Sequence, residues 1–254
     1  MTQAPRRAFV VAHYDPAGRV AWNLRDLVAH LATLGRVTFV STNLSGDAAQ
    51  SLGGGVQVIT RPNEGYDFYS YKRGIEALGS LAGFDEVVIL NSSFVCLDPA
   101  RLTERFFSRA RPGIDLLGLT ASYEYAPHLQ SYWVSFHGRR VLDSPVFARW
   151  WRDMEPISDR DLVIPRYEVG MSHAFHDAGF TLASAFSAPD ERRGAIARRN
   201  PTHVAWDALM EEFGMLKLEL LRTNPLRMDL AKLQAVLQAR PHWRALVDDA
   251  LATP

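Results

Sequence analysis

Polar side chains that can bind a ligand gather at two turns in the stretch from Arg61 to Asp98. The first turn runs from Asn63 to Asp67 and precedes apolar residues at helical spacing. The second turn, Asn91 to Ser93, directly follows an apolar run that is typical of a buried strand. In open α/β sheets, ligands bind beyond the carboxyl ends of the strands, and backbone N–H groups at a helix start favour anions. These turns are therefore the first candidates for a ligand-binding site.

Alternating strands and helices are predicted to position the two turns. Apolar runs predict strands at residues 7–13, 37–41, 56–60, 86–90, 115–120, 130–137 and 180–185. Helical periodicity predicts helices at residues 20–34, 67–78, 99–110, 144–154 and 165–178. Strands linked by helical crossovers indicate an α/β fold with an open, mostly parallel sheet flanked by helices. We expect residues 1–187 to form this domain and residues 188–254 to form a helical C-terminal tail that packs on it.

One predicted helix of the tail carries a charge on its apolar side. Its helical stripe contains Trp206, Met210, Phe213, Lys217 and Leu220. Lys217 therefore stands where an apolar residue is expected. Two interpretations are open: the lysine stem runs along the edge of the core while the ammonium group reaches water, or the tail folds over the site and Lys217 contacts the ligand.

Composition limits the class of protein. The 254 residues include 47% hydrophobic and 22% charged residues, so a large core is expected and global disorder is not. The 28 basic and 28 acidic residues balance, which argues against a broad nucleic-acid interface. Cys96 is the only cysteine, so no intrachain disulfide can form, and no apolar run is long enough to span a membrane. We expect a soluble, cytoplasmic protein.

Several common enzyme motifs are absent from the sequence. The first predicted strand leads into the turn from Tyr14 to Gly18, which lacks the G-x-G-x-x-G pattern of dinucleotide-binding folds. A Walker A phosphate loop is also missing, and so is the G-x-S-x-G pattern of serine hydrolases. These absences disfavour a dinucleotide-dependent enzyme, a phosphate-loop enzyme and a serine hydrolase.

A series of short motifs connects the chain to a known family. The motifs extend from Ala12 to Pro225 and are, in order, AHYDP, RPNEGYDFYSYKRG, DEVVILNSSF, SYWVSF, YEVGMS, NPTHVAWDAL and LLRTNP. In their order and spacing they resemble the rhamnan synthesis protein F family. The resemblance implies a GT-A-like nucleotide-sugar fold, in which the donor binds at the strand ends of an open α/β sheet.

The resemblance also implies an activity. Proteins of this family are glycosyltransferases, or glycosyltransferase-like domains, of bacterial polysaccharide assembly. We therefore expect an inverting enzyme that moves a deoxyhexose such as L-rhamnose from dTDP-L-rhamnose to the glycan acceptor of a surface polysaccharide such as lipopolysaccharide. Peripheral association with the membrane or with other polysaccharide enzymes is part of this expectation. The alternative is a non-catalytic module that binds a nucleotide sugar or a glycan within an assembly.

One departure from the resembled fold concerns the metal. GT-A enzymes usually carry an Asp-x-Asp motif where this chain has Asn91, Ser92 and Ser93. Mg²⁺ and Mn²⁺ are hard cations that prefer carboxylate oxygens, so no metal ligands are predicted in the chain. Either the metal is dispensable, or side-chain cations replace its charge, or it binds weakly through the donor diphosphate.

Glycosyl transfer requires groups that hold the donor. For the nucleoside, the candidates are Tyr14, Asp15, Asn63, Gly65 and Asp67. Asp67 is also a plausible helix N-cap, and the two roles are compatible. Asn91, Ser92 and Ser93 are donor-binding candidates at the strand end, and the candidates for the diphosphate are Lys72, His203 and Lys217. A solvated helix face is an alternative explanation for Lys72, and a capping or packing role is one for His203.

The acceptor hydroxyl must lose a proton to a carboxylate or a histidine. Glu168 is the first candidate for this base, because it is predicted in the first turn of the helix at 165–178, near Gly170. In the resembled fold an acidic residue at such a helix start activates the acceptor. The helix dipole also explains a carboxylate at this place. Glu124, in an aromatic loop, is the second candidate.

Overall fold

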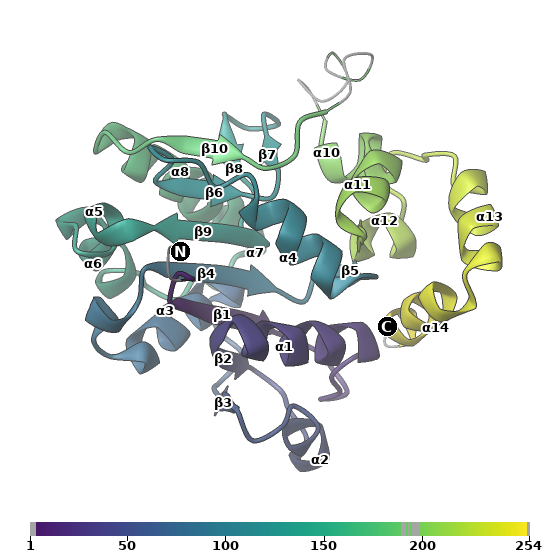
Figure 1. The fold of residues 1–254 in the computed structure, drawn as a ribbon, viewed down its shortest axis with the longest axis horizontal. Helices are drawn as coiled ribbons and strands as arrows, with labels where there is room; N and C mark the ends of the chain where they lie inside the picture. The colour runs from purple at the N-terminus through teal and green to yellow at the C-terminus, as the bar shows by residue number, and fades with distance from the viewer. Residues whose placement is uncertain (1–3, 189–191, 193, 195–198, 253–254) are drawn as a thin grey trace.

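The computed structural model describes residues 4–188, 192, 194 and 199–252 (Figure 1). The strands are β1 (Arg7–His13), β2 (Gly35–Ser41), β3 (Val56–Thr60), β4 (Glu86–Asn91), β5 (Phe94–Cys96), β6 (Leu116–Gly118), β7 (Ala121–Ser122), β8 (His128–Leu129), β9 (Trp133–His137), β10 (Leu182–Ser184) and β11 (Met215–Lys217). The helices before β10 are α1 (Trp22–Leu34), α2 (Gly46–Gln50), α3 (Tyr66–Leu78), η1 (Leu81–Gly83), α4 (Pro99–Phe107), α5 (Gly138–Leu142), α6 (Pro145–Arg152), α7 (Arg160–Val163), η2 (Ile164–Val169) and α8 (Gly170–Asp177). The tail contains α10 (Pro201–Val204), α11 (Trp206–Phe213), α12 (Leu218–Arg222), α13 (Ala231–Ala239) and α14 (Pro241–Leu251).

A mixed, seven-stranded sheet forms the centre of the fold, in the order β10-β6-β9-β4-β1-β2-β3. β1 pairs in parallel with β2 and β4, β2 pairs in parallel with β3, and β10 pairs in parallel with β6. Within this sheet, β9 runs antiparallel to its neighbours β4 and β6. The prediction of an open, mostly parallel sheet flanked by helices is confirmed.

The strand register aligns several strand ends at one edge of the sheet. His13, at the end of β1, pairs with Ser41 of β2, and Ser41 pairs with Thr60 of β3. Asn91 is the last residue of β4. Because β9 is antiparallel, its first residue, Trp133, lies beside the end of β4. The turns that follow β1, β3 and β4 therefore lie at one edge of the sheet, where the end of β4 contacts the loop that precedes β9.

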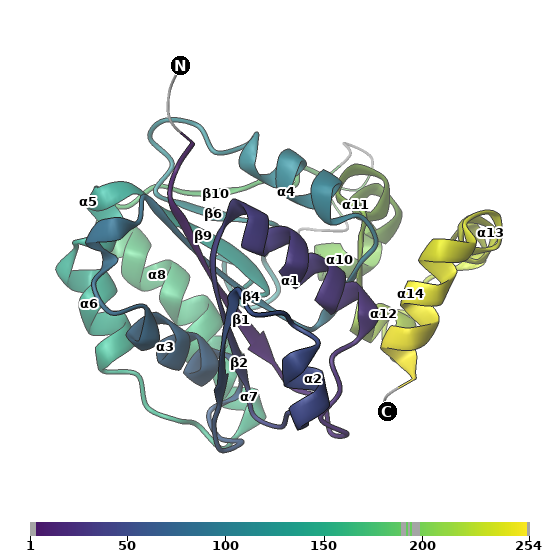
Figure 2. The ribbon, with the colours of Figure 1, turned by 60° about the horizontal axis from the view of Figure 1, so that its bottom comes forward.

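Helices cover both faces of the sheet (Figure 2). Successive residues of a strand point to opposite faces, so β1 contributes to two cores. Phe9 and Val11 pack with residues of α1, α4 and α11, whereas Ala8, Val10 and Ala12 pack with residues of α3, α5, α6 and α8. Burial on both sides explains why this strand is almost entirely apolar.

The tail packs against the carboxyl edge of the sheet (Figure 1). β11 pairs antiparallel with β5, and a third apolar cluster joins β5 to α11, α12, α13 and α14. Asp249 of α14 also accepts hydrogen bonds from Nη2 of Arg19 at 3.0 Å and from the N–H of Trp22 at 2.6 Å. The tail is thus fastened both to β5 and to the start of α1. None of the helices described by the structure combines the length and the hydropathy that a membrane span requires.

One prediction about helices is wrong and another holds in part. The apolar stripe of the tail does not lie on one helix, because α11 ends at Phe213, its C-cap Gly214 adopts a φ of 63°, and Met215–Lys217 then form β11. The segment predicted as a helix at 165–178 is helical, but the helix starts earlier. The chain is already helical at α7 and passes through η2, a π-helical turn, before α8 begins at Gly170.

Candidate active site

The turn after β4 is held by its own side chains and by its neighbours. Oδ1 of Asn91 accepts hydrogen bonds from the N–H of Ser93 at 3.1 Å and from its Oγ at 2.5 Å. The N–H of Asn91 donates to the carbonyl of Tyr132 at 3.2 Å, and the N–H of Ser92 donates to the carbonyl of Ala12 at 3.1 Å. These bonds connect the turn to the loop before β9 and to the end of β1.

Asp67 approaches this turn from the start of α3. Its Oδ2 accepts a hydrogen bond from Nδ2 of Asn91 at 2.7 Å. Burial raises the pKa of Asp67 to about 6, although Lys217 and Asn91 act in the opposite direction. The predicted N-cap role of Asp67 is wrong, because Gly65 is the N-cap and no side chain caps this helix. The carboxylate instead connects the first polar turn to the second.

Arg61 holds the first turn from inside the protein. This side chain is buried, and its guanidinium donates hydrogen bonds to the carbonyls of Pro62 (2.8 Å), Glu64 (2.5 Å) and Tyr66 (2.6 Å) and to Oγ of Ser70 (2.7 and 3.0 Å). The planar fork of arginine can serve several acceptors at once. Sequence reasoning missed this residue, and the available signal was an arginine placed between a strand and a Pro-Asn-Glu-Gly turn.

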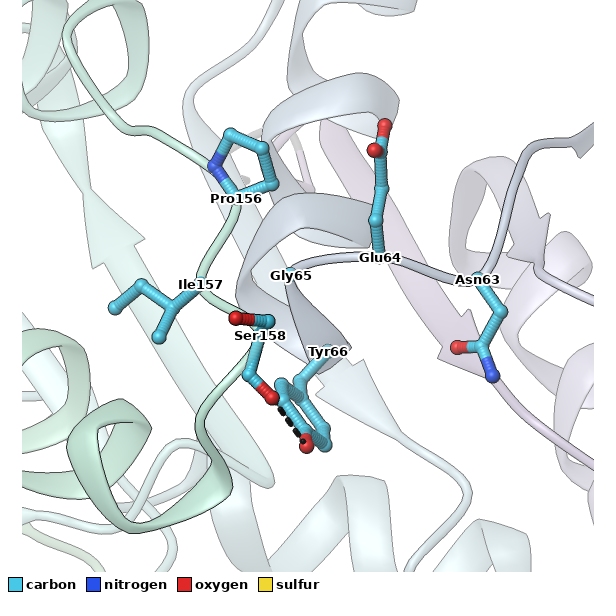
Figure 3. Close-up of a pocket in the computed structure, with 7 residues that line it drawn as sticks. All are labelled: Asn63, Glu64, Gly65, Tyr66, Pro156, Ile157 and Ser158. Carbon is cyan, nitrogen blue, oxygen red and sulfur yellow. Dashed lines mark hydrogen bonds between the residues drawn. The ribbon is translucent and has the colours of Figure 1, made fainter.

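A pocket of about 340 Å³ lies beside the first turn (Figure 3). Its lining residues come from two segments and are Asn63, Glu64, Gly65, Tyr66, Pro156, Ile157 and Ser158. In Figure 3 the two segments face each other, and the hydroxyl of Tyr66 donates to the carbonyl of Ser158 at 3.2 Å. Of the predicted residues, Asn63 and Gly65 line this pocket, whereas Asp67 does not.

Gly65→Ala is expected to lower the free energy of unfolding by about 2–4 kcal/mol, because strain and overpacking add. Gly65 adopts a φ of 65°, and a Cβ would lie 2.6 Å from Cβ of Tyr69 and 2.9 Å from Cα of Pro156. Gly179 is a matched control, since it follows α8 with a φ of 81° and a Cβ would meet nothing within 4 Å. Urea denaturation should show a clearly smaller loss for Gly179→Ala. Equal losses would mean that the contact with Pro156 imposes no restriction.

Lys217 reaches the second turn from the tail. Its Nζ donates to Oγ of Ser93 at 2.5 Å and lies 4.2 Å from the ring centre of Tyr132. Burial lowers the pKa of Lys217 to about 8, while the neighbouring carboxylates of Glu168 and Asp67 oppose this shift. The tail therefore places an ammonium group directly at the end of β4, in contact with a neutral hydroxyl and an aromatic face.

Glu168 lies in η2. The prediction that it lies in the first turn of a helix is wrong, because α7 precedes η2. Its Oε2 accepts hydrogen bonds from the N–H of Ser131, at 2.7 Å, and from the hydroxyl of the same serine. Its Oε1 lies 3.3 Å from Nε2 of His128. Burial raises the pKa of Glu168, but the hydrogen bonds from His128 and Ser131 outweigh burial and hold it below its ordinary value. π-Helical turns occur frequently at functional sites.

His128 is a second residue that sequence reasoning missed. Burial lowers its pKa, but the hydrogen bonds to Glu168 and to the carbonyl of Ala126 outweigh burial and raise it above its ordinary value. Its Nδ1 lies 2.7 Å from that carbonyl oxygen, so Nε2 is directed at Glu168. A protonated His128 keeps Glu168 ionised. The available signal was a histidine at the end of the aromatic loop that contains Glu124.

Tyr14 and Asp15 follow β1 at the same edge of the sheet. Tyr14 is exposed, and its N–H lies 3.5 Å from Oγ of Ser92. Oδ1 of Asp15 accepts hydrogen bonds from the N–H groups of Ala17 at 2.8 Å and Arg19 at 3.2 Å, so this carboxylate shapes its own loop. Tyr14 therefore lies next to the turn after β4.

Three predicted residues make other contacts. Nζ of Lys72 donates to the carbonyls of Arg152 at 2.6 Å and Met154 at 3.0 Å, which ties α3 to the end of α6. His203 is buried, and its Nε2 lies 3.4 Å from a carboxylate oxygen of Glu219. Glu124 is exposed in the loop between β7 and β8. The structure therefore brings together Asp67, Asn91, Ser92, Ser93, Glu168 and Lys217, and it gives Lys72 and His203 other partners. Glu124 is exposed, and its charge helps to raise the pKa of His128.

Comparison with known proteins identifies the family. Residues 37–233 match the family described as rhamnan synthesis protein F. The chain therefore belongs to the rhamnan synthesis protein F family, which confirms the resemblance of its motifs. It is also 28% identical, over 138 residues, to the uncharacterized protein y4gN of Sinorhizobium fredii. That match covers 52% of this chain and 36% of the relative, so the chain spans little more than a third of that protein's length.

Solved structures with a similar chain path include transferases of nucleotide and sugar groups. A mannosyltransferase of Pyrobaculum calidifontis, in complex with GDP-Man and Mn²⁺, is 12% identical with a TM-score of 0.39, covering 98% of this chain and 87% of that one. A glycosyltransferase involved in glycosylation of the major capsid of PBCV-1 is 10% identical with a TM-score of 0.43, covering 92% and 100%. A cytidylyltransferase of Leptospira borgpetersenii is 13% identical with a TM-score of 0.42, covering 94% and 96%.

Proposed function

We propose that this chain is a glycosyltransferase that moves a sugar from a nucleoside diphosphate donor to a glycan acceptor in bacterial polysaccharide synthesis. Membership of the rhamnan synthesis protein F family supports the process. The observation that supports glycosyl transfer as the reaction is the convergence of Asp67, Glu168 and Lys217 at the carboxyl edge of the sheet. The two carboxylates lie close enough to the ammonium group to raise its pKa. Open α/β sheets bind their ligands at this edge.

The turns after β1 and β3 are assigned to the nucleoside. Asn63 and Gly65 line the pocket beside the first turn, and Tyr14 and Asp15 follow β1 nearby. Asp67 supplies a carboxylate that can accept a hydrogen bond from the ribose or the base. Asn91 to Ser93 and Lys217 then face the diphosphate. Lys72 is left out of this assignment because its ammonium group binds carbonyls of Arg152 and Met154. Glu124 is left out because it is exposed, although its charge helps to raise the pKa of His128.

The reaction follows from these assignments. The acceptor oxygen attacks the anomeric carbon, the bond from that carbon to the diphosphate oxygen breaks, and Glu168 takes the acceptor proton. Attack opposite the leaving diphosphate inverts the configuration. The family supports L-rhamnose as the transferred sugar and dTDP-L-rhamnose as the donor. A surface-polysaccharide acceptor would bring the protein to the membrane surface or to other enzymes of the same assembly.

A second candidate function is a non-catalytic module that binds a nucleotide sugar. The observation that favours it is the neutral turn Asn91 to Ser93, which lacks the carboxylates expected in a GT-A enzyme. In that case the site would bind the donor without cleaving the bond between the sugar and the diphosphate. Binding and turnover must therefore be measured separately.

A thermal-shift screen with turnover assays tests the proposed function. A ligand that binds the folded state raises the melting temperature in proportion to its occupancy. We expect one series of nucleoside diphosphates and their sugars to stabilise the protein, and the matching sugar nucleotide to be hydrolysed or transferred. Binding without turnover across donors and acceptors would favour the non-catalytic module. No stabilisation by any nucleoside diphosphate, with Mn²⁺ or with EDTA, would reject both.

A further inference from the structure

We propose that the ammonium group of Lys217 takes the place of a divalent cation at the donor diphosphate, so that binding and transfer need no metal. This inference rests on the proposed function and names the group that offsets the charge of the leaving diphosphate. Three features of the structure support it: the donor set at the end of β4, the way the backbone holds Lys217, and the charges around its ammonium group.

The donor set at the end of β4 does not fit Mg²⁺ or Mn²⁺. Oδ1 of Asn91 already accepts two hydrogen bonds from Ser93, and Nδ2 of the same asparagine faces Asp67. Oγ of Ser93 donates to Asn91 and accepts from Lys217. At phosphate substrates a hard divalent cation is usually held by one or two carboxylates together with waters and phosphate oxygens, and the turn from Asn91 to Ser93 offers no carboxylate. Nowhere in the part of the chain that the structure describes do three or more His, Cys, Asp or Glu side chains group in a way that could hold a metal ion.

The backbone places Lys217 opposite this turn. Lys217 pairs with Phe94 in the β11–β5 ladder, and the N–H of Leu218 donates to the carbonyl of Ser93 at 3.0 Å. The lysine is therefore anchored on both sides by main-chain hydrogen bonds, and its side chain crosses the ring of Tyr132 to reach Ser93. A cation that is held before the substrate arrives stabilises developing negative charge without a reorganisation cost.

The charges around Lys217 suit an anionic ligand. Asp67 of α3, Glu168 of η2 and Glu219 of α12 all act to keep the ammonium group protonated against its burial. None of these carboxylates forms a direct ion pair with Nζ, whose hydrogen-bond partner is the neutral hydroxyl of Ser93. A diphosphate oxygen can therefore take a donor position on Nζ without displacing a carboxylate. A lysine with a purely structural role would be expected to form an ion pair with one of these carboxylates.

Nucleoside diphosphate binding with and without metal tests the inference. The probes are dTDP, UDP, GDP, CDP and ADP, titrated by calorimetry in EDTA and in Mn²⁺. The wild type should bind its preferred diphosphate within about twofold of the same affinity in both buffers. Lys217→Met should bind it ~10–100-fold more weakly, which is the range for losing a charge-assisted hydrogen bond. Lys232→Met is the matched control, because Lys232 is exposed and pairs with Asp207 and Glu211.

A pH series separates ligand contact from a structural role. The pKa of Lys217 is about 8 in the free protein, and Asp67, with a pKa of about 6, is ionised above pH 7. Glu168, with its lowered pKa, is ionised there too. Affinity of the wild type should therefore fall as pH rises above 8, by up to about tenfold per unit. Lys217→Arg should bind with little change over the same range, because arginine stays protonated.

The outcomes separate this inference from the proposed function. If wild-type binding disappears in EDTA and returns with Mn²⁺, the proposed function stands but the inference about Lys217 is overturned. The same conclusion follows if a folded Lys217→Met protein binds the diphosphate as tightly as the wild type. If Lys217→Met fails to fold, the pH series on the wild type and Lys217→Arg decides, and parallel pH profiles overturn the inference. No binding by the wild type under any condition removes the proposed function and this inference together.

Discussion

Glu168→Gln is expected to slow sugar transfer by about 10²–10⁴-fold while the affinity for the nucleoside diphosphate stays the same. Glutamine keeps the shape of the side chain, and its oxygen can still accept the hydrogen bonds of Ser131, but it cannot take a proton from the acceptor. His128 also loses the carboxylate that raises its pKa. Single-turnover transfer from the preferred donor, together with calorimetric titration of the diphosphate, measures the two effects separately.

Two further variants sharpen this test. Glu104→Gln, on the exposed side of α4, is the matched control and should transfer at the wild-type rate. Asp67→Asn tests whether Asp67, and not Glu168, is the general base. The pKa of Asp67, at about 6, is closer to neutral pH than the lowered pKa of Glu168. A folded Glu168→Gln protein with wild-type transfer would remove Glu168 from the mechanism. Lost transfer in Asp67→Asn with donor binding intact would assign the proton to Asp67 instead.

Arg61→Met is expected to lower the free energy of unfolding by about 3–5 kcal/mol. The variant loses the hydrogen bonds of a buried guanidinium to three carbonyls and to Ser70, and a hydrogen bond to a charged group contributes about 1.5–3 kcal/mol. The affinity for the nucleoside diphosphate should fall as well, because Arg61 holds the turn that carries Gly65 and leads into Asp67. Urea denaturation and calorimetric titration measure the two losses. Arg61→Lys should lie between the wild type and Arg61→Met, as an ammonium group lacks the planar fork.

Arg73→Met provides the comparison for this prediction. Arg73 lies on the same helix as Asp67, is half exposed and pairs with Glu76 at 2.8 Å. Removing such a surface ion pair changes stability by about 0–1 kcal/mol. If Arg61→Met loses no more stability than Arg73→Met, water replaces the guanidinium and the turn does not depend on it.

The central sheet could be predicted because its strands are buried on both faces. β1 and β4 are continuous apolar runs, and each ends at a polar residue, so their positions and limits are visible in the sequence. The meeting of Asp67 and Asn91 followed from one topological rule, that turns after parallel strands share an edge. Their 2.7 Å hydrogen bond agrees with that expectation, although the cap role expected of Asp67 was wrong.

The remaining parts of the site depend on contacts that leave no local pattern. β11 has three residues, and its partner β5 lies about 120 positions earlier in the chain, so helical periodicity across 206–220 gave a false continuous helix. Arg61 acts through backbone carbonyls, whose directions are set by the positive φ of Gly65 and Tyr66. Glu168 lies in a π-helical turn, and a single extra residue per turn is invisible to a 3.6-residue period.

The β11–β5 pairing has a consequence for how this protein can be divided. A fragment cut near residue 187 would keep every loop assigned to the nucleoside, yet it would lose the positive charge assigned to the diphosphate. The two segments therefore form one electrostatic unit despite their separation along the chain.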